Sequence, residues 1–146
     1  MGGWAGMEIR TGFTCGAFDL LHPGHLHLLD WAKQHCDYLI VGLHTDPTID
    51  RPTEKDRPVQ SVFERWAQLN AVHSVDEIIP YETERDLRNL LATQPITVRF
   101  LGSDYEHRGV TGEYICIARH IDVLYAPRLH DFSSTEMRRR LRGFER

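Results

Sequence analysis

The chain has 146 residues, enough for one sizeable core and too few for two ordinary domains. Its 17 basic and 21 acidic residues leave a net charge of -4, which argues against general affinity for nucleic acid or for anionic membrane. Three widely spaced cysteines indicate free thiols in a reducing compartment rather than a disulfide framework. No apolar run has the length of a membrane span, and no secretory signal precedes a possible second start at Met7. We therefore expect a cytoplasmic protein.

Short β-type runs alternate with helical runs along the chain. Several β-type runs are continuously apolar, as in strands covered on both faces. They occupy residues 9–15, 38–43, 76–81, 96–102 and 121–126. Helices are expected between them after Pro23, after the capping pairs Ser61–Glu64 and Thr83–Asp86, over 111–120, and after Ser133–Glu136. This pattern predicts an α/β fold, a single doubly wound parallel sheet of the Rossmann-like type.

The stretch FDLLHPGHLHLL, residues 18–29, places three histidines where the first expected strand ends and the first expected helix begins. One interpretation is a metal site, but His27 lies about 200° around the helix from His25, and no HExxH motif or second ligand pair accompanies them. A second interpretation is that they are surface or capping histidines of an amphipathic helix. The third is a phosphate site at a helix start.

The residues around the histidines favour the phosphate site. Cys15 and Gly16 close the strand, and Gly24 lies at the start of the helix. Free backbone N–H groups and the dipole of a helix N-terminus attract anions. Imidazoles at the rim of such a site can donate hydrogen bonds to charge that develops on phosphate oxygens. Ligands of parallel sheets bind beyond the carboxyl ends of the strands, so the loops 15–25 and 127–135 are the expected site.

Two segments of the chain match known signatures. GAFDLLHPGH, residues 16–25, closely resembles the nucleotide-binding signature of the nucleotidyltransferase superfamily that carries a His-x-Gly-His motif. FSSTEMR, residues 132–138, resembles the second signature of that superfamily, a Ser/Thr cluster that opens the last helix. As a whole the chain is similar to small bacterial glycerol-3-phosphate cytidylyltransferases. The resemblance implies a catalytic domain over 9–142, with an N-terminal extension at 1–8 and a tail at 143–146.

The resemblance implies catalytic roles for His22, His25, Lys55 and Arg128. The two histidines match those that contact the nucleotide's phosphates and stabilise the transition state in this family. Lys55 lies in the loop where the family places a lysine that reaches the triphosphate, and Arg51 competes with it for that role. Arg128 belongs to the second signature, which holds the phosphate tail.

Nucleotide-binding roles fall on the two signatures and on the segment after the fourth strand. They are expected for Cys15, Gly16, Ala17, Phe18, Asp19, Gly24, Asp104, Ser133, Ser134 and Thr135. Ala17 departs from the threonine of many glycerol-phosphate enzymes, which removes one side-chain hydrogen bond. Arg57, a further competitor for the lysine's place, and Arg65 are expected to bind the acceptor substrate.

The reaction that the resemblance implies is nucleotidyl transfer. A phosphate oxygen of glycerol 3-phosphate would attack the α-phosphorus of CTP, giving CDP-glycerol and pyrophosphate. Because the acceptor is already anionic, positioning and charge stabilisation suffice without a protein nucleophile. Mg²⁺ would enter with the nucleotide, so no dedicated metal site is expected.

Two other functions stay open at this point. The chain also resembles the adenylyltransferase module that activates heptose phosphate with ATP in lipopolysaccharide synthesis, and RPVQSVFER (57–65) suits either enzyme. The alternative from another class is a nucleotide-binding regulatory protein without catalysis. Small members of the family form homodimers, so the resemblance also implies a homodimer.

Overall fold

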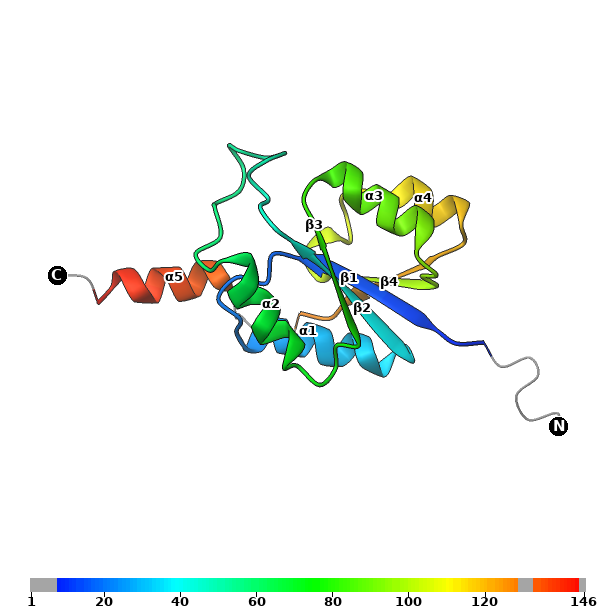
Figure 1. The fold of residues 1–146 in the computed structure, drawn as a ribbon, viewed down its shortest axis with the longest axis horizontal. Coiled ribbons are helices and arrows are strands. Elements are labelled where there is room, and N and C mark those ends of the chain that lie inside the picture. The colour runs from blue at the N-terminus through cyan, green and yellow to red at the C-terminus, as the bar shows by residue number, and fades with distance from the viewer. Residues whose placement is uncertain (1–7, 129–132, 145–146) are drawn as a thin grey trace.

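The computed structural model describes residues 8–128 and 133–144 of the chain. In these ranges five parallel strands form one sheet in the order β3-β2-β1-β4-β5 (Figure 1). The strands are β1 (Thr11–Gly16), β2 (Tyr38–His44), β3 (Glu77–Tyr81), β4 (Val98–Gly102) and β5 (Asp122–Ala126). Each strand begins and ends within about two residues of an expected run, so the predicted parallel sheet is confirmed.

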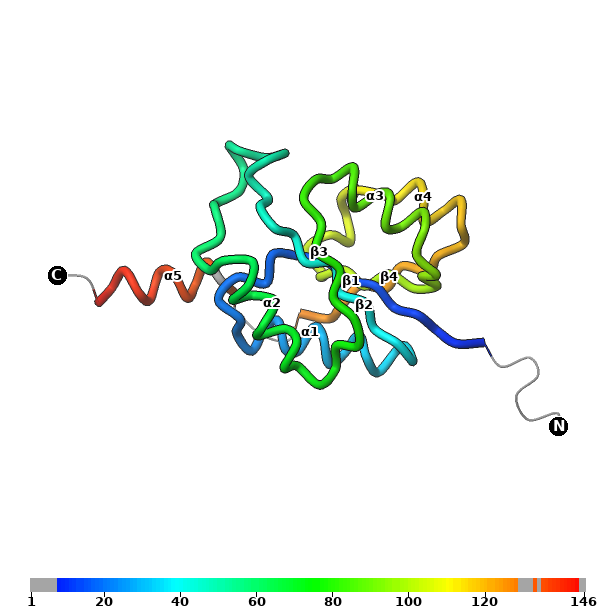
Figure 2. Tube along the Cα trace, in the orientation of Figure 1, coloured from blue at the N-terminus to red at the C-terminus, as the bar shows by residue number. Residues whose placement is uncertain are grey.

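Helices cover both faces of this sheet. In the described ranges they are α1 (Pro23–Gln34), α2 (Val62–Asn70), α3 (Glu84–Thr93), α4 (Glu113–Ala118) and α5 (Ser134–Arg142), with a short 3-10 turn over Ser103–Tyr105. The first two lie on one face and the next two on the other, while α5 extends away from the body (Figures 1 and 2). No helix of the described part is long and apolar enough to cross a membrane.

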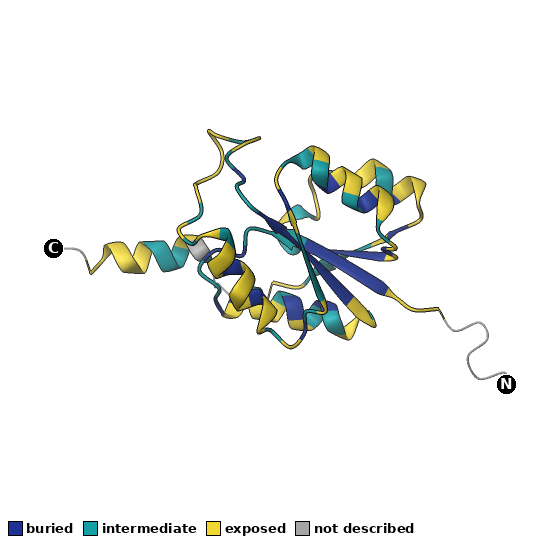
Figure 3. Cartoon of the chain, viewed as in Figure 1, coloured by how far each residue is buried: buried dark blue, intermediate teal, exposed yellow. Residues whose placement is uncertain are grey.

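Each face of the sheet carries its own buried cluster. On the α1 and α2 side, Leu29 and Leu69 pack with the strand residue Phe100, all of them without exposed surface. On the α3 and α4 side, Leu91 and Phe13 are equally buried. The central strands β1, β2 and β4 are accordingly buried along most of their length, the edge strands β3 and β5 are mostly half-buried, and α5 has no buried residue among those described (Figure 3). Continuous burial explains why the strand sequences are apolar runs rather than alternating ones.

The predicted helix starts are confirmed at α2 and α3 and partly at α5. Ser61 caps α2 in a reciprocal capping box, and Thr83 does the same for α3. At α5 the Ser133 hydroxyl accepts from the Glu136 N–H at 3.0 Å, but the Glu136 carboxylate turns to Arg139 instead. The Arg139 hydrogen bond lowers the pKa of Glu136 to about 2. A guanidinium offers a carboxylate stronger, charge-assisted bonds than a backbone N–H does.

Candidate active site

A cavity of about 740 Å³ opens at the carboxyl edge of the sheet. Its walls come from the loops after β1, β2, β3 and β4 and from the beginning of α5. Of the residues predicted for the site, those lining it are Cys15, Gly16, Ala17, Phe18, Asp19, His25, Lys55 and Thr135. The position agrees with the rule that parallel sheets bind ligands beyond the carboxyl ends of their strands.

His22 and His25 together form the cap of α1. The N–H of Gly24 donates to Nδ1 of His22 at 3.0 Å, and the N–H of His22 donates to Nδ1 of His25 at 3.3 Å. The two rings stack with their centroids 3.9 Å apart. The N–H of Gly24 is therefore engaged by His22, and the predicted contact of Gly24 with the nucleotide stays a prediction. The two signature histidines are thus also the capping residues of α1, as the second interpretation of the sequence expected.

The caps fix the protonation state of both imidazoles. An Nδ1 that accepts a hydrogen bond carries no proton, so the proton of each neutral ring lies on Nε2. Burial, and then the neighbouring His22, lower the pKa of His25 to about 3, although Asp19 acts in the opposite direction. His25 lines the cavity and offers it an Nε2–H donor, whereas His22 is buried behind it. Both Nδ1 atoms are engaged, which also argues against the metal interpretation.

The loop between β1 and α1 has an unusual backbone. Phe18 and Leu20 adopt positive φ angles of 50° and 52°, a region that bulky residues rarely enter. Such conformations persist only where the surroundings impose them. Here Phe18 is buried in the core and the N–H of Leu20 donates to the Gln60 side chain at 2.7 Å. The turn that precedes the two histidines is therefore strained, and its contacts hold it in place.

Asp19 ties three segments to this turn. Its buried carboxylate accepts from the N–H groups of Val59 and Gln60 at 2.8 and 2.9 Å. It also pairs with Arg138 of α5. A carboxylate with several donors is well compensated for its burial. Asp19 therefore holds the histidine loop, the segment before α2 and the last helix at one point; its predicted contact with nucleotide stays a prediction.

Arg65 occupies a different place from the one expected. It is 2% exposed and does not line the cavity. Its guanidinium donates to the carbonyl oxygens of Ala17, His44 and Thr45, and its Nε donates to that of Gln60. Because the Arg65 guanidinium donates to backbone carbonyl groups, the geometry favours a positioning role for Arg65 over the predicted contact with the acceptor. Burial lowers the pKa of Arg65, while Asp19 and Asp46 act against that shift.

The loop after β2 presents the basic side chains between which sequence alone could not choose. Lys55 and Arg51 both line the cavity, and Arg57 does not. Lys55 is exposed, whereas Arg51 reaches across to Glu84 at the start of α3, where its Nη2 donates to Oε1. The predicted contact of Lys55 with the triphosphate stays a prediction, while the Arg51 guanidinium is paired with Glu84.

The structure describes only part of the second signature. Thr135 lines the cavity and Ser133 caps α5, whereas the Ser134 side chain lies outside the described part of the chain. Arg128 pairs with Asp104 at 3.0 Å; both are exposed and neither lines the cavity. The structure thereby joins the loops after β4 and β5, and the predicted contacts of this pair with the nucleotide stay predictions.

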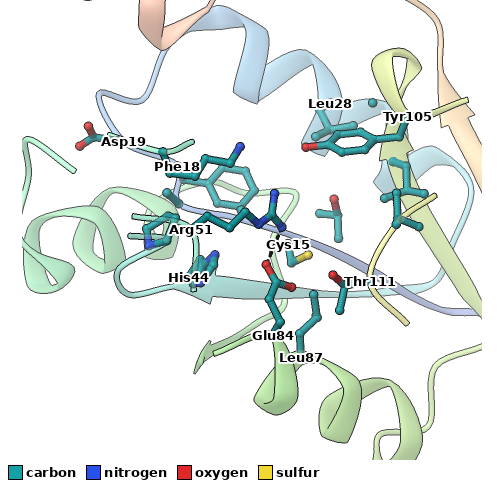
Figure 4. A pocket seen from close by; sticks show the side chains of 18 of the residues that line it. Cys15, Phe18, Asp19, Leu28, His44, Arg51, Glu84, Leu87, Tyr105 and Thr111 are labelled. Carbon is teal, nitrogen blue, oxygen red and sulfur yellow. Dashed lines mark hydrogen bonds and ion pairs between the residues drawn. The ribbon is translucent and has the colours of Figure 1, made fainter. Parts of the chain in front are cut away.

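Several cavity residues were missed by the sequence analysis. Among the lining residues that were not expected are Tyr81, Glu84, Arg99, Tyr105 and Thr111 (Figure 4 labels three of them). Arg99 is the informative miss, because a charged residue inside the apolar strand run TVRFLG marks a buried polar site. Burial raises the pKa of the neighbouring Cys15 thiol, which makes it a poor nucleophile.

Metal ligands are not gathered in this region. Among the described residues, no group of three or more His, Cys, Asp or Glu side chains is placed to hold a metal ion. Two carboxylates of the β2–α2 loop, Glu54 and Asp56, do line the cavity.

A Rossmann-like sheet with paired histidines at a helix start defines a nucleotide-binding domain of the HxGH nucleotidyltransferase class. The family model described as cytidylyltransferase-like matches residues 13–140, and the chain belongs to this family. As a member it is an enzyme domain of the nucleotidyltransferase type. The membership confirms the superfamily that the two signatures resemble.

Two relatives show which proteins of this family the chain is similar to. The chain is 39% identical over 139 residues to the bifunctional protein HldE of Rhodopseudomonas palustris, covering 95% of this chain and 28% of that protein. It is 40% identical over 145 residues to HldE of Acidiphilium cryptum, with coverages of 96% and 29%. The chain thus spans a little over a quarter of the length of these relatives. They are not glycerol-3-phosphate cytidylyltransferases, the family first expected.

Solved structures share the fold. The lipopolysaccharide core biosynthesis protein from Thermoplasma volcanium superposes with a TM-score of 0.68 at 23% identity, over 84% of this chain and 100% of that one. Pantoate-beta-alanine ligase from Francisella tularensis gives 0.58 at 18% identity, over 89% and 65%. At such identities the likeness is one of architecture.

Proposed function

We propose that this protein transfers AMP from ATP to a heptose phosphate and releases pyrophosphate. The observation that carries the nucleotidyl transfer is the reciprocal cap of His22 and His25, which leaves His25, a residue lining the cavity at the carboxyl edge of the sheet, as the neutral Nε2–H tautomer. The choice of ATP and a sugar phosphate rests on the similarity to HldE proteins, which supports the adenylyltransferase resemblance over the cytidylyltransferase one.

The cavity suits an in-line displacement. An oxygen of the acceptor phosphate attacks the α-phosphorus of ATP, forming a new P–O bond while the bond to the bridging oxygen breaks and pyrophosphate carries off its electron pair. His25 donates to oxygens on which charge builds up in the transition state, and its low pKa keeps it a neutral donor. Lys55 and Thr135 line the cavity where they can hold the leaving phosphates. No residue has to become covalently bound.

We propose that Mg²⁺ arrives with the nucleotide. This ion keeps several waters and binds through substrate phosphates with one or two carboxylates. The described residues fit that mode, since Glu54 and Asp56 line the cavity without forming a closed cage. When bound, the ion would neutralise charge on the phosphates.

CTP with glycerol 3-phosphate is the second candidate, because the matching family model is described as cytidylyltransferase-like. A competition experiment decides between the pairs. Equimolar ATP and CTP are incubated with the protein, Mg²⁺ and either heptose 1-phosphate or glycerol 3-phosphate, and the products are identified by mass spectrometry. We expect ADP-heptose to dominate. CDP-glycerol as the main product would overturn the proposal in favour of the second candidate, and nucleotide binding without any product would indicate a regulatory protein.

The predicted homodimer stays a proposal. Its test is the mass of the protein by light scattering at micromolar concentration, where a monomer would contradict it.

A further inference from the structure

The cavity continues beyond the phosphate-binding region to an end that the mechanism above does not use. We call this part the α3 end; it comprises Tyr81, Glu84, Arg99 and Thr111. Glu84 is the first residue of α3, and Arg99 is the second residue of β4. In Figure 4, Glu84 and Thr111 lie beside Cys15 below the Arg51 side chain, on the opposite side of Arg51 from Phe18 and Asp19.

Two buried polar atoms at the α3 end have no hydrogen-bond partner among the described residues. They are Oε2 of Glu84, an acceptor, and Nε of Arg99, a donor. The rest of each group is engaged: Glu84 Oε1 accepts from Arg51, the Thr111 side chain is a second hydrogen-bonding neighbour of this carboxylate, and Nη1 of Arg99 donates to the Thr111 carbonyl at 2.5 Å. Arg99 is only 2% exposed. Buried polar groups are normally paired, so each unpaired atom calls for an explanation.

A hydroxyl group matches this pair of atoms. It donates one hydrogen bond and accepts others, so one hydroxyl, or two on adjacent carbons, can serve Glu84 Oε2 and Arg99 Nε together. Both side chains line the same cavity. A site built to hydrogen-bond a substrate hydroxyl discriminates strongly against analogues that lack it.

The direction of the reaction places the acceptor at this end. In an in-line displacement the attacking and leaving oxygens lie on opposite sides of the phosphorus. The leaving phosphates belong near Lys55 and the start of α5, so the acceptor approaches from the α3 side. Arg51, which Glu84 holds over the cavity, is then the cation nearest to the acceptor's phosphate.

Charge restricts what the acceptor can be. At the α3 end Glu84 is the single acid, set against Arg51 and Arg99, and the other acids that line the cavity, Asp19, Glu54 and Asp56, come from the β1–α1 and β2–α2 loops. The α3 end is thus not anionic, and it offers no binding advantage to an acceptor with an ammonium group. A neutral polyol carrying one phosphate satisfies both the charge and the two unpaired atoms.

We infer that Glu84 and Arg99 form a specificity subsite for hydroxyl groups of the acceptor, which makes these two side chains determinants of acceptor recognition. The inference rests on the proposed nucleotidyl transfer and deepens it. Glu84 Oε2 accepts from an acceptor hydroxyl and Arg99 Nε donates to a hydroxyl oxygen.

Steady-state kinetics of Glu84→Gln test this subsite. The matched control is Glu82→Gln, an exposed carboxylate two residues earlier. We expect Glu84→Gln to raise the KM for heptose 1-phosphate about tenfold and to leave the KM for the nucleotide within about twofold. The control should leave both constants unchanged. A variant that moves the nucleotide KM, or neither KM, would overturn the inference.

Two further arms keep the outcomes separate. Monodeoxy analogues of heptose 1-phosphate should identify one hydroxyl whose removal abolishes the difference between wild type and Glu84→Gln; a penalty that persists with every analogue would contradict hydroxyl recognition.

If the wild type makes no product with any acceptor, the proposed function fails, and calorimetric titration of heptose 1-phosphate in the presence of a non-hydrolysable ATP analogue still tests the subsite. Tenfold weaker binding by Glu84→Gln supports it there, and equal binding refutes it. Arg99→Lys, checked by thermal melt, should behave like Glu84→Gln.

Discussion

The helices α1 and α5 both begin at the cavity, yet the protein holds their N-termini in different ways. The start of α1 is built into the core: Gly24, Leu29 and Ala32 are buried, and the cap is made by side chains of the signature itself. The helix α5 has no buried residue among those described and projects from the body (Figure 3). Its link to the first signature is the ion pair between Arg138 and Asp19.

This difference suggests a division of labour. Transition-state stabilisation depends on donors that are fixed before the reaction, which is what a core-anchored, reciprocally capped pair of imidazoles provides. A nucleotide tail needs only to be held, and a surface helix that contributes a threonine can do that. We therefore expect changes at the α1 start to affect turnover and changes at the α5 start to affect nucleotide binding.

The largest expected effect is that of His25→Ala. Loss of one donor to the transition state should lower kcat by about two to three orders of magnitude, with a much smaller change in ATP affinity. Stopped-time pyrophosphate assays and calorimetry measure the two quantities. Near-normal turnover would remove the histidine from the mechanism and would make the two helix starts equivalent.

The next comparison sets the two arginines that hold these regions against each other. Arg65→Met should lower the free energy of unfolding by about 3 kcal/mol, because it leaves buried carbonyl oxygens of the histidine loop without donors. Arg138→Met should leave the melting temperature within a few degrees and weaken ATP binding, because Asp19 keeps two backbone N–H donors when the ion pair is lost and α5 is released. Denaturant titration of both variants provides the test. Equal destabilisation by the two would show that α5 is as much part of the core as α1.

At the α5 start, Thr135 and Ser133 can be separated. Thr135→Ala should raise the nucleotide KM about fivefold to tenfold without affecting the melting temperature, because Thr135 faces the cavity and caps nothing. Ser133→Ala should instead cost about 1 kcal/mol of stability, the usual value of one N-cap. Kinetics and melts on the same preparations distinguish them. If Thr135→Ala lowered only stability, the second signature would be a helix cap and not a phosphate site.

A smaller effect concerns pH. The pKa of His25 is about 3 in the folded protein, below the value near 6.5 of an unfolded imidazole, so the unfolded state binds more protons between these values. The stability that follows is fully present above about pH 6.5 and is lost as the pH falls toward 3. The melting temperature of the wild type should therefore fall more steeply between pH 6.5 and pH 4 than the melting temperature of His25→Gln. His107→Gln, at an exposed loop position, serves as the control. Parallel curves for wild type and His25→Gln would contradict the assignment of a neutral, desolvated ring.

Sequence reasoning succeeded where local patterns determine the structure. Apolar runs located every strand, and the His-x-Gly-His signature located one wall of the cavity, because both are encoded in consecutive residues. Arg65 was expected to bind the acceptor but is buried. The segment FERW, residues 63–66, does not show which way the Arg65 side chain points. A signal was nevertheless present: Arg65 shares one helix face with Val62 and Leu69, spaced for burial.

The α3 end of the cavity could not be assembled from the sequence. Glu84 reads as an ordinary acid of a helix first turn, and Arg51 as one of three basic residues in a loop. Their pairing joins residues 33 positions apart, and only the packing of α3 against the sheet brings them together. Arg99 alone gave a hint, as a charge within an otherwise apolar strand.

Pyrophosphate release in a single turnover tests most directly whether this cavity performs nucleotidyl transfer. Protein in excess over ATP is mixed with Mg²⁺ and heptose 1-phosphate, while ATP binding is measured by calorimetry on the same sample. One equivalent of pyrophosphate and one of nucleotide-sugar per bound ATP is the predicted result, with both lost in His25→Ala while ATP still binds. Stoichiometric ATP binding with no pyrophosphate, from ATP or from CTP and with either acceptor, would contradict catalysis and identify the domain as a nucleotide-binding protein.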